Sequence, residues 1–380
     1  MNILINASNQ KGYGGGQVTD SLCRNLSSYP QHKFVVVLNP CLGYLKDAIS
    51  VYDNVTVELY GIKNSLKTLC WGRDNFLDNL IVRYNIEAVL SVFGPTRWNP
   101  KVPHLAGFAL SQLVIPESPF YQIMTKKQAL RQWVRNATWL HFFKQGTKFL
   151  YTENPFITER VKKKWPNREV ITVTNYYNQL FDNPDLWKKF DLPKFDGTTI
   201  LTLSRNDVHK HITILPRICN VLKTKHPYFK FRFILPEEEV NFPIPSDLRD
   251  NFVFTGVVPI QSCPSLYSQC DIAFQPTLLE CFTATYPEAM RMELPLITCN
   301  LDFARKLCGE GAVFFEWDDE NQAADTIYEI ATDKKLANKM ISAGKKQLLH
   351  FDNYEQRTRK LIEAIERLAS TGTLYENFAK

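Results

Sequence analysis

The chain has 380 residues, well above the usual size of a single domain, which favours two domains of comparable length. It is 44% hydrophobic and 22% charged, a composition that excludes an intrinsically disordered protein. The net charge is +6, from 45 Lys and Arg against 39 Asp and Glu, and so small a surplus does not indicate a nucleic-acid-binding protein. The surplus is local, because segment 121–165 holds ten Lys or Arg against two Glu.

Short runs of β-branched and apolar residues alternate with helix-length segments, which predicts β-α-β units and mostly parallel sheets. The first series of predicted strands comprises 3–6, 34–38, 55–59, 88–92, 104–108, 149–152 and 170–173. The second comprises 200–204, 231–235, 253–255, 271–275, 296–299 and 313–315. A polar, proline-containing stretch at 175–197 separates the two series, so the join between two α/β domains is predicted there.

Ligands of open α/β sheets bind beyond the carboxyl ends of the strands, and two turns at such positions hold unusual residues. After the first strand, consecutive glycines precede a helical pattern and could present backbone N–H groups to a phosphate, although a flexible turn explains them equally well. After the strand at 200–204, Arg205 and Lys210 could converge on a diphosphate. Taken alone, these two cations are better explained as solvated loop charges.

The turn after 271–275 holds two carboxylates eight residues apart, Glu280 in a loop and Glu288 near the start of a helix. Their order resembles the E-x7-E region of retaining glycosyltransferases of the group 1 type, family four. The resemblance extends to Thr202-Leu-Ser-Arg205 with Lys210, similar to the family's V-G-R-L-x-x-x-K-N, and to the Phe-Val-Phe-Thr-Gly-Val-Val at 252–258, similar to V-x-F-L-G-x-V. The C-terminal half matches in unbroken order, whereas the N-terminal half matches only through its glycines and its strand-helix rhythm.

The resemblance implies the GT-B fold, with two Rossmann-like domains of mostly parallel sheets that face each other across a cleft. Residues 1–178 would form the acceptor-side domain and 195–352 the donor-side domain. The C-terminal helix, in 353–380, would return to the first domain. Its apolar stripe needs a packing partner in any case, and comprises Leu361, Ile362, Ile365 and Leu368.

The resemblance also implies roles for single residues. Arg205 and Lys210 would neutralise the diphosphate leaving group without a metal ion or other cofactor, and Glu280 would lie beside the transferred sugar. Glu288 would accept the two ribose hydroxyls. The other donor-binding residues are expected to be Gly15, Gly16, Gly256, Val258, Cys281, Phe282, Thr283 and Ala284. Both Arg205 and Glu288 are expected in a solvent-open cleft.

The sequence departs from the family pattern in two places. Cys281, Thr283 and Leu294 stand where the family commonly has glycine, so side chains are expected to crowd the sugar pocket. A histidine that many relatives have falls here on Phe108 or Ala109. His104 lies on the predicted strand itself and is expected to be a core residue.

These features together predict a nucleotide-sugar-dependent retaining glycosyltransferase that acts on a glycan or lipid-linked glycan, in surface polysaccharide synthesis. Two alternatives remain: a nucleotide-sugar 2-epimerase of the same fold, and a non-catalytic sugar-nucleotide binder. The nine cysteines contain no C-x2-C pair and no apolar run approaches the length of a membrane span, so a cytoplasmic protein with reduced thiols is expected.

The basic segment 121–165 permits two interpretations. Its cations, which include Lys162, Lys163 and Lys164, could meet an anionic membrane surface that presents a lipid-linked acceptor. Alternatively, a helical stripe in the segment packs against the first sheet and leaves the lysines solvated. That stripe comprises Leu130, Trp133, Val134, Ala137 and Leu140.

Overall fold

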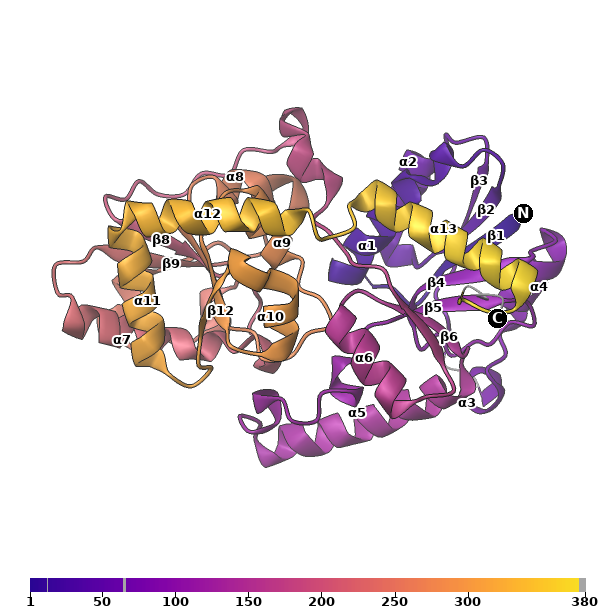
Figure 1. The fold of residues 1–380 in the computed structure, drawn as a ribbon, viewed down its shortest axis with the longest axis horizontal. Helices are drawn as coiled ribbons and strands as arrows, with labels where there is room; N and C mark the ends of the chain where they lie inside the picture. The colour runs from indigo at the N-terminus through magenta and orange to yellow at the C-terminus, as the bar shows by residue number, and fades with distance from the viewer. Residues whose placement is uncertain (12, 64–65, 376–380) are drawn as a thin grey trace, which may run out of the picture. The chain divides into compact units, whose positions relative to one another are not determined.

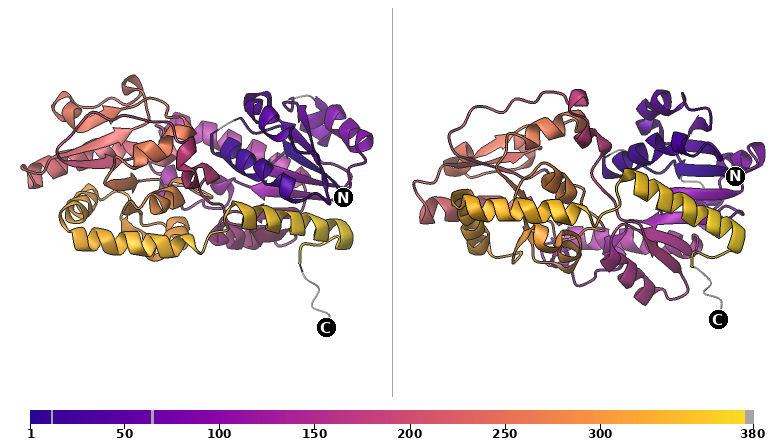
Figure 2. Two further views of the ribbon diagram at one scale, coloured as in Figure 1. Left: turned by 90° about the horizontal axis from the view of Figure 1, so that it is seen from above. Right: turned by 45° about the horizontal axis from the view of Figure 1, so that its top comes forward.

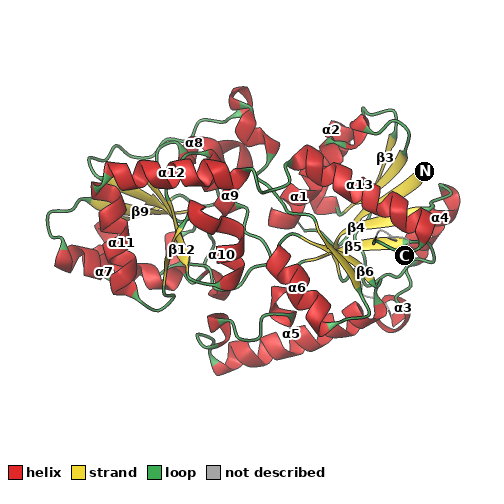
Figure 3. Ribbon diagram, viewed as in Figure 1, coloured by secondary structure: helices red, strands yellow, loops and turns green. Residues whose placement is uncertain are grey.

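The computed structural model describes residues 1–11, 13–63 and 66–375, and the chain divides into two compact units. Unit 1 comprises Met1–Ile115, Lys126–Asn178 and Asp352–Lys380, and unit 2 comprises Pro116–Thr125 and Gln179–Phe351. Each unit is built on one parallel sheet with helices packed around it (Figures 1 and 3). This is the predicted pair of Rossmann-like domains.

The sheet of unit 1 has seven parallel strands in the order β3-β2-β1-β4-β5-β6-β7. The strands are β1 (Asn2–Ala7), β2 (Lys33–Leu38), β3 (Val55–Leu59), β4 (Ala88–Gly94), β5 (His104–Phe108), β6 (Phe149–Thr152) and β7 (Glu169–Thr172). In the register of the central strands, Ile3 of β1 lies between Phe34 of β2 and Ala88 of β4. All seven predicted strands of the first series are therefore confirmed, with ends that differ by at most two residues.

Both faces of this sheet are covered by helices and buried. Successive side chains of a strand point to opposite faces, so each strand contributes to both cores. Ile3 and Ile5 contribute to the core on one face, and Leu4 to the core on the other. Helices α1 (Tyr13–Arg24), α2 (Tyr44–Ile49) and α13 (Tyr354–Thr371) cover the first face, and α4 (Asn75–Arg83) covers the second. The unit also contains α3 (Leu66–Trp71), α5 (Lys126–Gln145) and α6 (Pro155–Lys164).

The C-terminal helix α13 belongs to unit 1, as predicted (Figure 2). It begins at a capping box formed by Asn353 and Gln356. The predicted apolar stripe is buried in the same core as β1 and β2. Arg357 is also buried, and its Nη2 donates to Glu153 Oε1 at 3.1 Å.

The sheet of unit 2 has six parallel strands in the order β10-β9-β8-β11-β12-β13. They are β8 (Thr198–Leu201), β9 (Phe231–Leu235), β10 (Phe252–Phe254), β11 (Ile272–Gln275), β12 (Leu296–Cys299) and β13 (Val313–Phe315). Its helices are α7 (Leu215–Lys225), α8 (Cys263–Tyr267), α9 (Thr285–Arg291), α10 (Asp302–Cys308), α11 (Glu320–Thr332) and α12 (Lys334–Leu348). The second strand series is confirmed, although β8 ends three residues before the predicted end because Ser204 N turns back to Thr202 O at 2.8 Å.

Two segments outside these strands and helices are held on unit 2 by hydrogen bonds. In the predicted join, Phe190 N donates to Ser265 Oγ and Leu192 N to Gln269 Oε1, both at 3.0 Å. The chain between β5 and β6 supplies Pro116–Thr125, where Ser118 Oγ donates to Leu278 O at 2.7 Å. Unit 2 is therefore assembled from two separate stretches of sequence.

Seven of the nine cysteines are buried, and Cys41 and Cys70 are exposed. All nine are free thiols. Within the described ranges, no helix is both long enough and apolar enough to cross a membrane.

Candidate functional site

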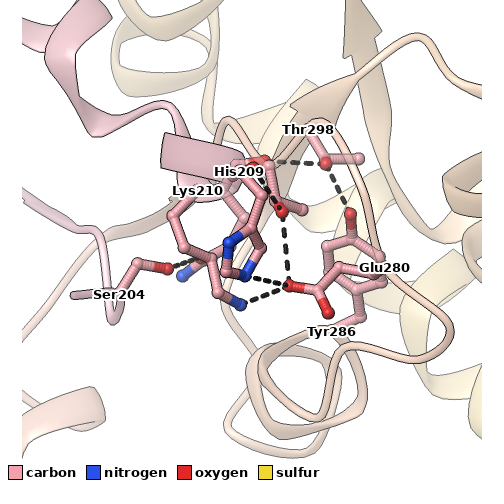
Figure 4. A network of polar contacts seen from close by, with 8 residues as sticks. Ser204, His209, Lys210, Glu280, Tyr286 and Thr298 are labelled. Carbon is pink, nitrogen blue, oxygen red and sulfur yellow. Dashed lines mark hydrogen bonds and ion pairs between the residues drawn. The ribbon is translucent and has the colours of Figure 1, made fainter. Parts of the chain in front are cut away.

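A cation and a carboxylate meet at the carboxyl ends of β8 and β11 (Figure 4). Lys210 Nζ lies 2.5 Å from Glu280 Oε1. The same carboxylate oxygen lies 3.3 Å from Thr277 Oγ1 and 3.7 Å from His209 Nε2. The side chains of Lys210 and Glu280 are 23% and 16% exposed, so this pair is accessible to a ligand yet partly shielded from water.

Backbone contacts fix the two loops that supply the pair. Val208–Lys210 forms a 3-10 turn, and His211 after it has φ +52°, in the left-handed region. The carbonyl of His209 accepts hydrogen bonds from Leu278 N at 2.7 Å and from Thr277 Oγ1 at 3.2 Å. The loop after β8 is therefore attached directly to the loop after β11, which holds Lys210 against Glu280.

A second set of hydrogen bonds joins the strand ends that carry these loops (Figure 4). Ser204 Oγ donates to Gln275 Oε1 at 3.0 Å, and Thr298 Oγ1 donates to Gln275 O at 2.8 Å. Because Thr298 uses its only hydroxyl proton in this bond, Tyr286 OH donates to Thr298 Oγ1, at 2.8 Å. The ends of β8, β11 and β12 are thus joined into one platform of buried polar groups.

The segment Pro116–Thr125 packs beside the Lys210–Glu280 pair. Ser118 holds the carbonyl of Leu278, and Phe120 lies edge-on to His209 with ring centroids 6.4 Å apart. Sequence reasoning did not include His209 or this segment in the site. The available signal for His209 was its position directly before Lys210 in the same tight turn.

Glu288 departs from expectation, because it is only 3% exposed rather than solvent-open. Its Oε2 accepts a hydrogen bond from Tyr267 OH at 3.0 Å, and residues on both sides of it in α9 are buried. Burial raises the pKa of Glu288 to about 7, although the Tyr267 hydroxyl and the charge of Lys210 act in the opposite direction. Arg205, in contrast, is exposed as expected.

The loop between the two carboxylates is filled with side chains. Cys281 is 6% exposed and Thr283 is 4% exposed, and beyond this loop Leu294, which follows α9, is also buried. Phe282 is half-buried and lies edge-on to Phe351, with centroids 5.9 Å apart. Across the described residues, Thr283 Oγ1 is buried and has no hydrogen-bond partner.

The glycines of the predicted donor site lie in different settings. Gly256 has φ +64°, and a Cβ at this position would lie 2.8 Å from Glu238 Oε1. Val258, two residues further on, is half-buried. The first glycine loop differs from expectation, because α1 already begins at Tyr13, so Gly15 and Gly16 lie in its first turn. A Cβ on Gly15 would lie 2.3 Å from Gln10 Oε1, the end of a flexible side chain that can move aside, so this contact does not explain the glycine.

The expected core role of His104 is confirmed. It is 4% exposed on β5, its Nε2 lies 2.8 Å from Ser91 Oγ, and desolvation lowers its pKa to about 3. Phe108, where the family histidine would fall, is a buried residue that packs edge-on against Phe143 and Trp165. In the ranges that the structure covers, no group of three or more His, Cys, Asp or Glu could hold a metal ion.

Comparison with known proteins gives a family match to one part of the chain. Residues 189–347 match the model of the family described as glycosyl transferases group 1. No curated protein matches the chain in sequence. Among solved structures, a glycosyltransferase from Rickettsia africae is 14% identical with a TM-score of 0.68, over 97% of this chain and 98% of its own.

Two further solved structures are similar in fold. Anabaena HepE in complex with UDP and glucose is 13% identical with a TM-score of 0.63, over 97% of this chain and 100% of that chain. A protein from Listeria monocytogenes, provisionally assigned as a UDP-N-acetylglucosamine 2-epimerase, is 9% identical with a TM-score of 0.59, over 100% of this chain and 99% of that chain. The chain therefore has the GT-B fold, and the part of it that contains the Lys210–Glu280 pair is similar in sequence to group 1 glycosyl transferases.

Proposed function

We propose that the protein is a retaining glycosyltransferase that moves a sugar from a nucleoside-diphosphate sugar to a hydroxyl of a glycan or lipid-linked glycan, in the synthesis of a surface polysaccharide. The observation that carries the proposal is the contact of Lys210 with Glu280 at the carboxyl edge of a parallel sheet, inside the region that matches group 1 glycosyl transferases. The complex of HepE with UDP and glucose supports a nucleotide-sugar donor.

In this proposal Arg205 and Lys210 bind the diphosphate. A lysine ammonium has three N–H donors, so Lys210 can keep its bond to Glu280 and still donate to phosphate oxygens. Arg205 is exposed and can form a bidentate pair with a phosphate. The two cations would then stabilise the negative charge that grows on the leaving group, with no metal ion or other cofactor.

The remaining predicted residues bind the other parts of the donor. Glu280 and the 281–284 loop address the transferred sugar, where the unpartnered hydroxyl of Thr283 can donate or accept. Glu288 accepts the ribose hydroxyls, with Tyr267 holding the position of its carboxylate. Within unit 2, Gly256 and Val258 complete the donor site beside the base.

The reaction breaks the bond between the anomeric carbon and the leaving phosphate oxygen and forms a bond from that carbon to the acceptor oxygen on the same face. The transition state resembles an oxocarbenium ion, so the protein's contribution is positioning and charge stabilisation. The departing phosphate oxygen takes the proton of the acceptor hydroxyl. No protein base is then required at the position of Phe108.

A cytoplasmic enzyme that works at the inner face of a membrane fits the basic segment 121–165. The acceptor would then be presented at an anionic surface, and nucleic acid would not be a partner. The membrane location concerns only where the enzyme binds its acceptor and is independent of the reaction at Lys210.

A donor screen tests the proposal. Release of nucleoside diphosphate is measured for a panel of nucleotide sugars with and without glycan acceptors, and the anomeric configuration of any product is determined by NMR. Turnover that depends on an acceptor, with the donor's configuration retained, is expected. Conversion of the donor in the absence of any acceptor would instead indicate a nucleotide-sugar 2-epimerase, the activity provisionally assigned to the similar Listeria protein. Donor binding without turnover on any acceptor would leave a non-catalytic binder.

Two arginine variants test whether the measured turnover depends on Arg205. Arg205→Ala should lower kcat/KM by an amount that corresponds to ~2 to 4 kcal/mol, mainly in rate, because a charge-assisted contact to the leaving group is lost. Arg217 is also a solvent-accessible arginine of unit 2, and it pairs at 3.4 Å with Glu320. Arg217→Ala is therefore the matched control and should retain activity. Equal activity of the two variants would contradict the assignment of Arg205.

A further inference from the structure

Helix α5, located in Figure 1, has one side that the protein covers and one that is exposed. The side that is half or fully buried follows Gln132, Asn136, Trp139 and Phe143, which recur at helical spacing. Gln132 is 7% exposed, and it accepts a hydrogen bond from Arg135 Nη2 at 2.8 Å and donates to Asn136 Oδ1 at 2.6 Å. Gln132, Asn136, Trp139 and Phe143 therefore mark the covered side of the helix.

The apolar stripe lies on the other side of α5 and is exposed. Leu130, Trp133 and Val134 are 63%, 69% and 52% exposed, and Ala137 continues the stripe at the next turn. The interpretation in which this stripe packs against the first sheet is therefore wrong for its first four members. Such large apolar side chains held in water over adjacent turns indicate a surface that binds a partner.

The charges around the stripe indicate what that partner is. From Lys126 to Gln145 the helix has five Lys or Arg and no Asp or Glu. Lys126, one helical turn before Leu130, is exposed, as are Lys127 and Arg131 beside the stripe. A second copy of this face would bring these cations against one another, which disfavours self-association.

A second exposed tryptophan extends the surface. Trp71 ends α3 and is 69% exposed. The last residues of α3 are bound to α5, because His141 Nε2 lies 3.2 Å from Leu69 O and Gln145 Nε2 donates to Cys70 O at 3.4 Å. His141 follows Ala137 by one turn, so Trp71 lies next to the continuation of the exposed stripe.

We infer that this surface, formed by Leu130, Trp133, Val134 and Trp71 with Lys126, Lys127 and Arg131, inserts into the interface of an anionic membrane. An exposed apolar stripe flanked by cations is the pattern of a helix that lies in the plane of the lipid headgroups, and tryptophan suits that depth. The inference deepens the proposed function, on which it rests, because it names the part of unit 1 through which the protein reaches a lipid-linked acceptor.

The cations at the end of α6 are in a different situation. Lys164 Nζ donates to Leu113 O, and Lys162 Nζ lies 5.3 Å above the ring of Tyr375. Both contacts are within unit 1, and no exposed apolar stripe accompanies them in α6, whose Ile157 and Val161 are buried. The inference therefore assigns membrane binding to α5 and not to the lysines of α6.

Cosedimentation of the full chain with vesicles tests the assignment. The vesicles are phosphatidylcholine alone and phosphatidylcholine with phosphatidylglycerol, and no donor or acceptor sugar is present. Binding to the anionic vesicles only is expected. The double variant Lys127→Glu/Arg131→Glu should bind at least about tenfold more weakly, because basic residues near an anionic leaflet lose their attraction. Lys162→Glu/Lys163→Glu changes the net charge equally and should bind as the wild type does.

A third variant tests insertion rather than charge attraction. Leu130→Ser/Trp133→Ser keeps every cation and should also bind at least about tenfold more weakly, because apolar area no longer enters the interface. Far-UV circular dichroism checks that each variant is folded, which is expected because the altered side chains are exposed. The inference is overturned by equal loss in the two charge-reversal variants, by unchanged binding of Leu130→Ser/Trp133→Ser, or by no binding to either vesicle.

Measurements of self-association and of turnover distinguish membrane binding from dimer formation and from failure of the proposed reaction. Self-association that is lost in Leu130→Ser/Trp133→Ser, without vesicle binding, would assign the face to a second copy of the chain and overturn the inference. Turnover of a water-soluble acceptor should be the same in this variant and in the wild type. Loss of vesicle binding with normal turnover therefore contradicts only the membrane surface, whereas vesicle binding without turnover on any acceptor contradicts only the proposed reaction.

Discussion

The stability of a Glu288→Gln variant, measured relative to that of the wild type, should rise as the pH rises. Burial raises the pKa of Glu288 from the ordinary 4.5 to about 7. A carboxyl with a raised pKa binds its proton more tightly in the folded state than in the unfolded state. The folded state is therefore favoured by protonation, and the contribution of Glu288 to stability falls as the pH rises from about 4.5 through about 7.

The magnitude follows from the two pKa values. At about 1.4 kcal/mol per pH unit, the change from 4.5 to about 7 corresponds to ~3 kcal/mol lost between the acid and alkaline limits. Glu288→Gln has no proton to lose, and its amide oxygen can still accept the hydrogen bond from Tyr267 OH. The buried NH2 group of the glutamine adds a cost of ~1 to 3 kcal/mol that does not change with pH.

The assay is urea-induced unfolding of the wild type and the variant at several pH values between 5 and 8.5, each pH used for both proteins at the same ionic strength (about 0.1 M, to fix screening). The difference between the two free energies of unfolding cancels every other titrating group. We expect this difference to move in favour of Glu288→Gln by ~2 to 3 kcal/mol from the lowest to the highest pH. A difference that is constant over the whole range would refute the reasoning, because Glu288 would then ionise as it does in water.

Three further changes have defined outcomes. Glu288→Ala leaves the buried Tyr267 hydroxyl without its acceptor, so it should lower the free energy of unfolding by ~1 to 3 kcal/mol in a urea titration, and unchanged stability would contradict the burial of this pair. Glu280→Gln removes the charge that holds Lys210, so it should lower kcat with nucleotide-sugar donor by ~10- to 100-fold while the protein unfolds at the same urea concentration; full activity would exclude Glu280 from the site. Arg357→Met leaves Glu153 buried and unpaired, so it should lower the free energy of unfolding by ~3 to 5 kcal/mol at pH 8. The loss should be smaller at pH 5.5, because burial raises the pKa of Glu153 to about 7 and the carboxyl is then mostly protonated. Adding Glu153→Gln to this variant should restore much of the stability lost at pH 8.

The positions of the strands in both units were predictable because parallel strands buried on two faces are continuous apolar runs, and such runs stand out from their polar surroundings. The position of α13 was predictable in part, since its apolar stripe requires a partner. Which sheet it covers does not follow from the stripe and came only from the resemblance. The contact of Lys210 with Glu280 joins loops 70 residues apart in sequence, so no local pattern contains it.

Burial was the least predictable property of the site. Glu288 is buried because Tyr267 of α8 closes over it, and nothing in the residues next to Glu288 indicates that contact. The orientation of α5 was also not predictable, here because a stripe expected to be buried is exposed. Its apolar stripe has the spacing of a core-facing side, yet Gln132 and Phe143 face the protein and Leu130 faces water. A helical period shows that a helix has two sides and does not show which side the protein covers.

The return of α13 to unit 1 has a consequence for biosynthesis. The core on one face of the first sheet includes side chains from Leu361 to Leu368, which leave the ribosome after every residue of unit 2 has been made. Unit 2, by contrast, ends at Phe351 and has all its residues by then. During translation the second unit to appear can therefore complete its fold first. The first unit keeps an uncovered apolar face until the last helix arrives, and this interval is when the nascent chain most needs protection from aggregation.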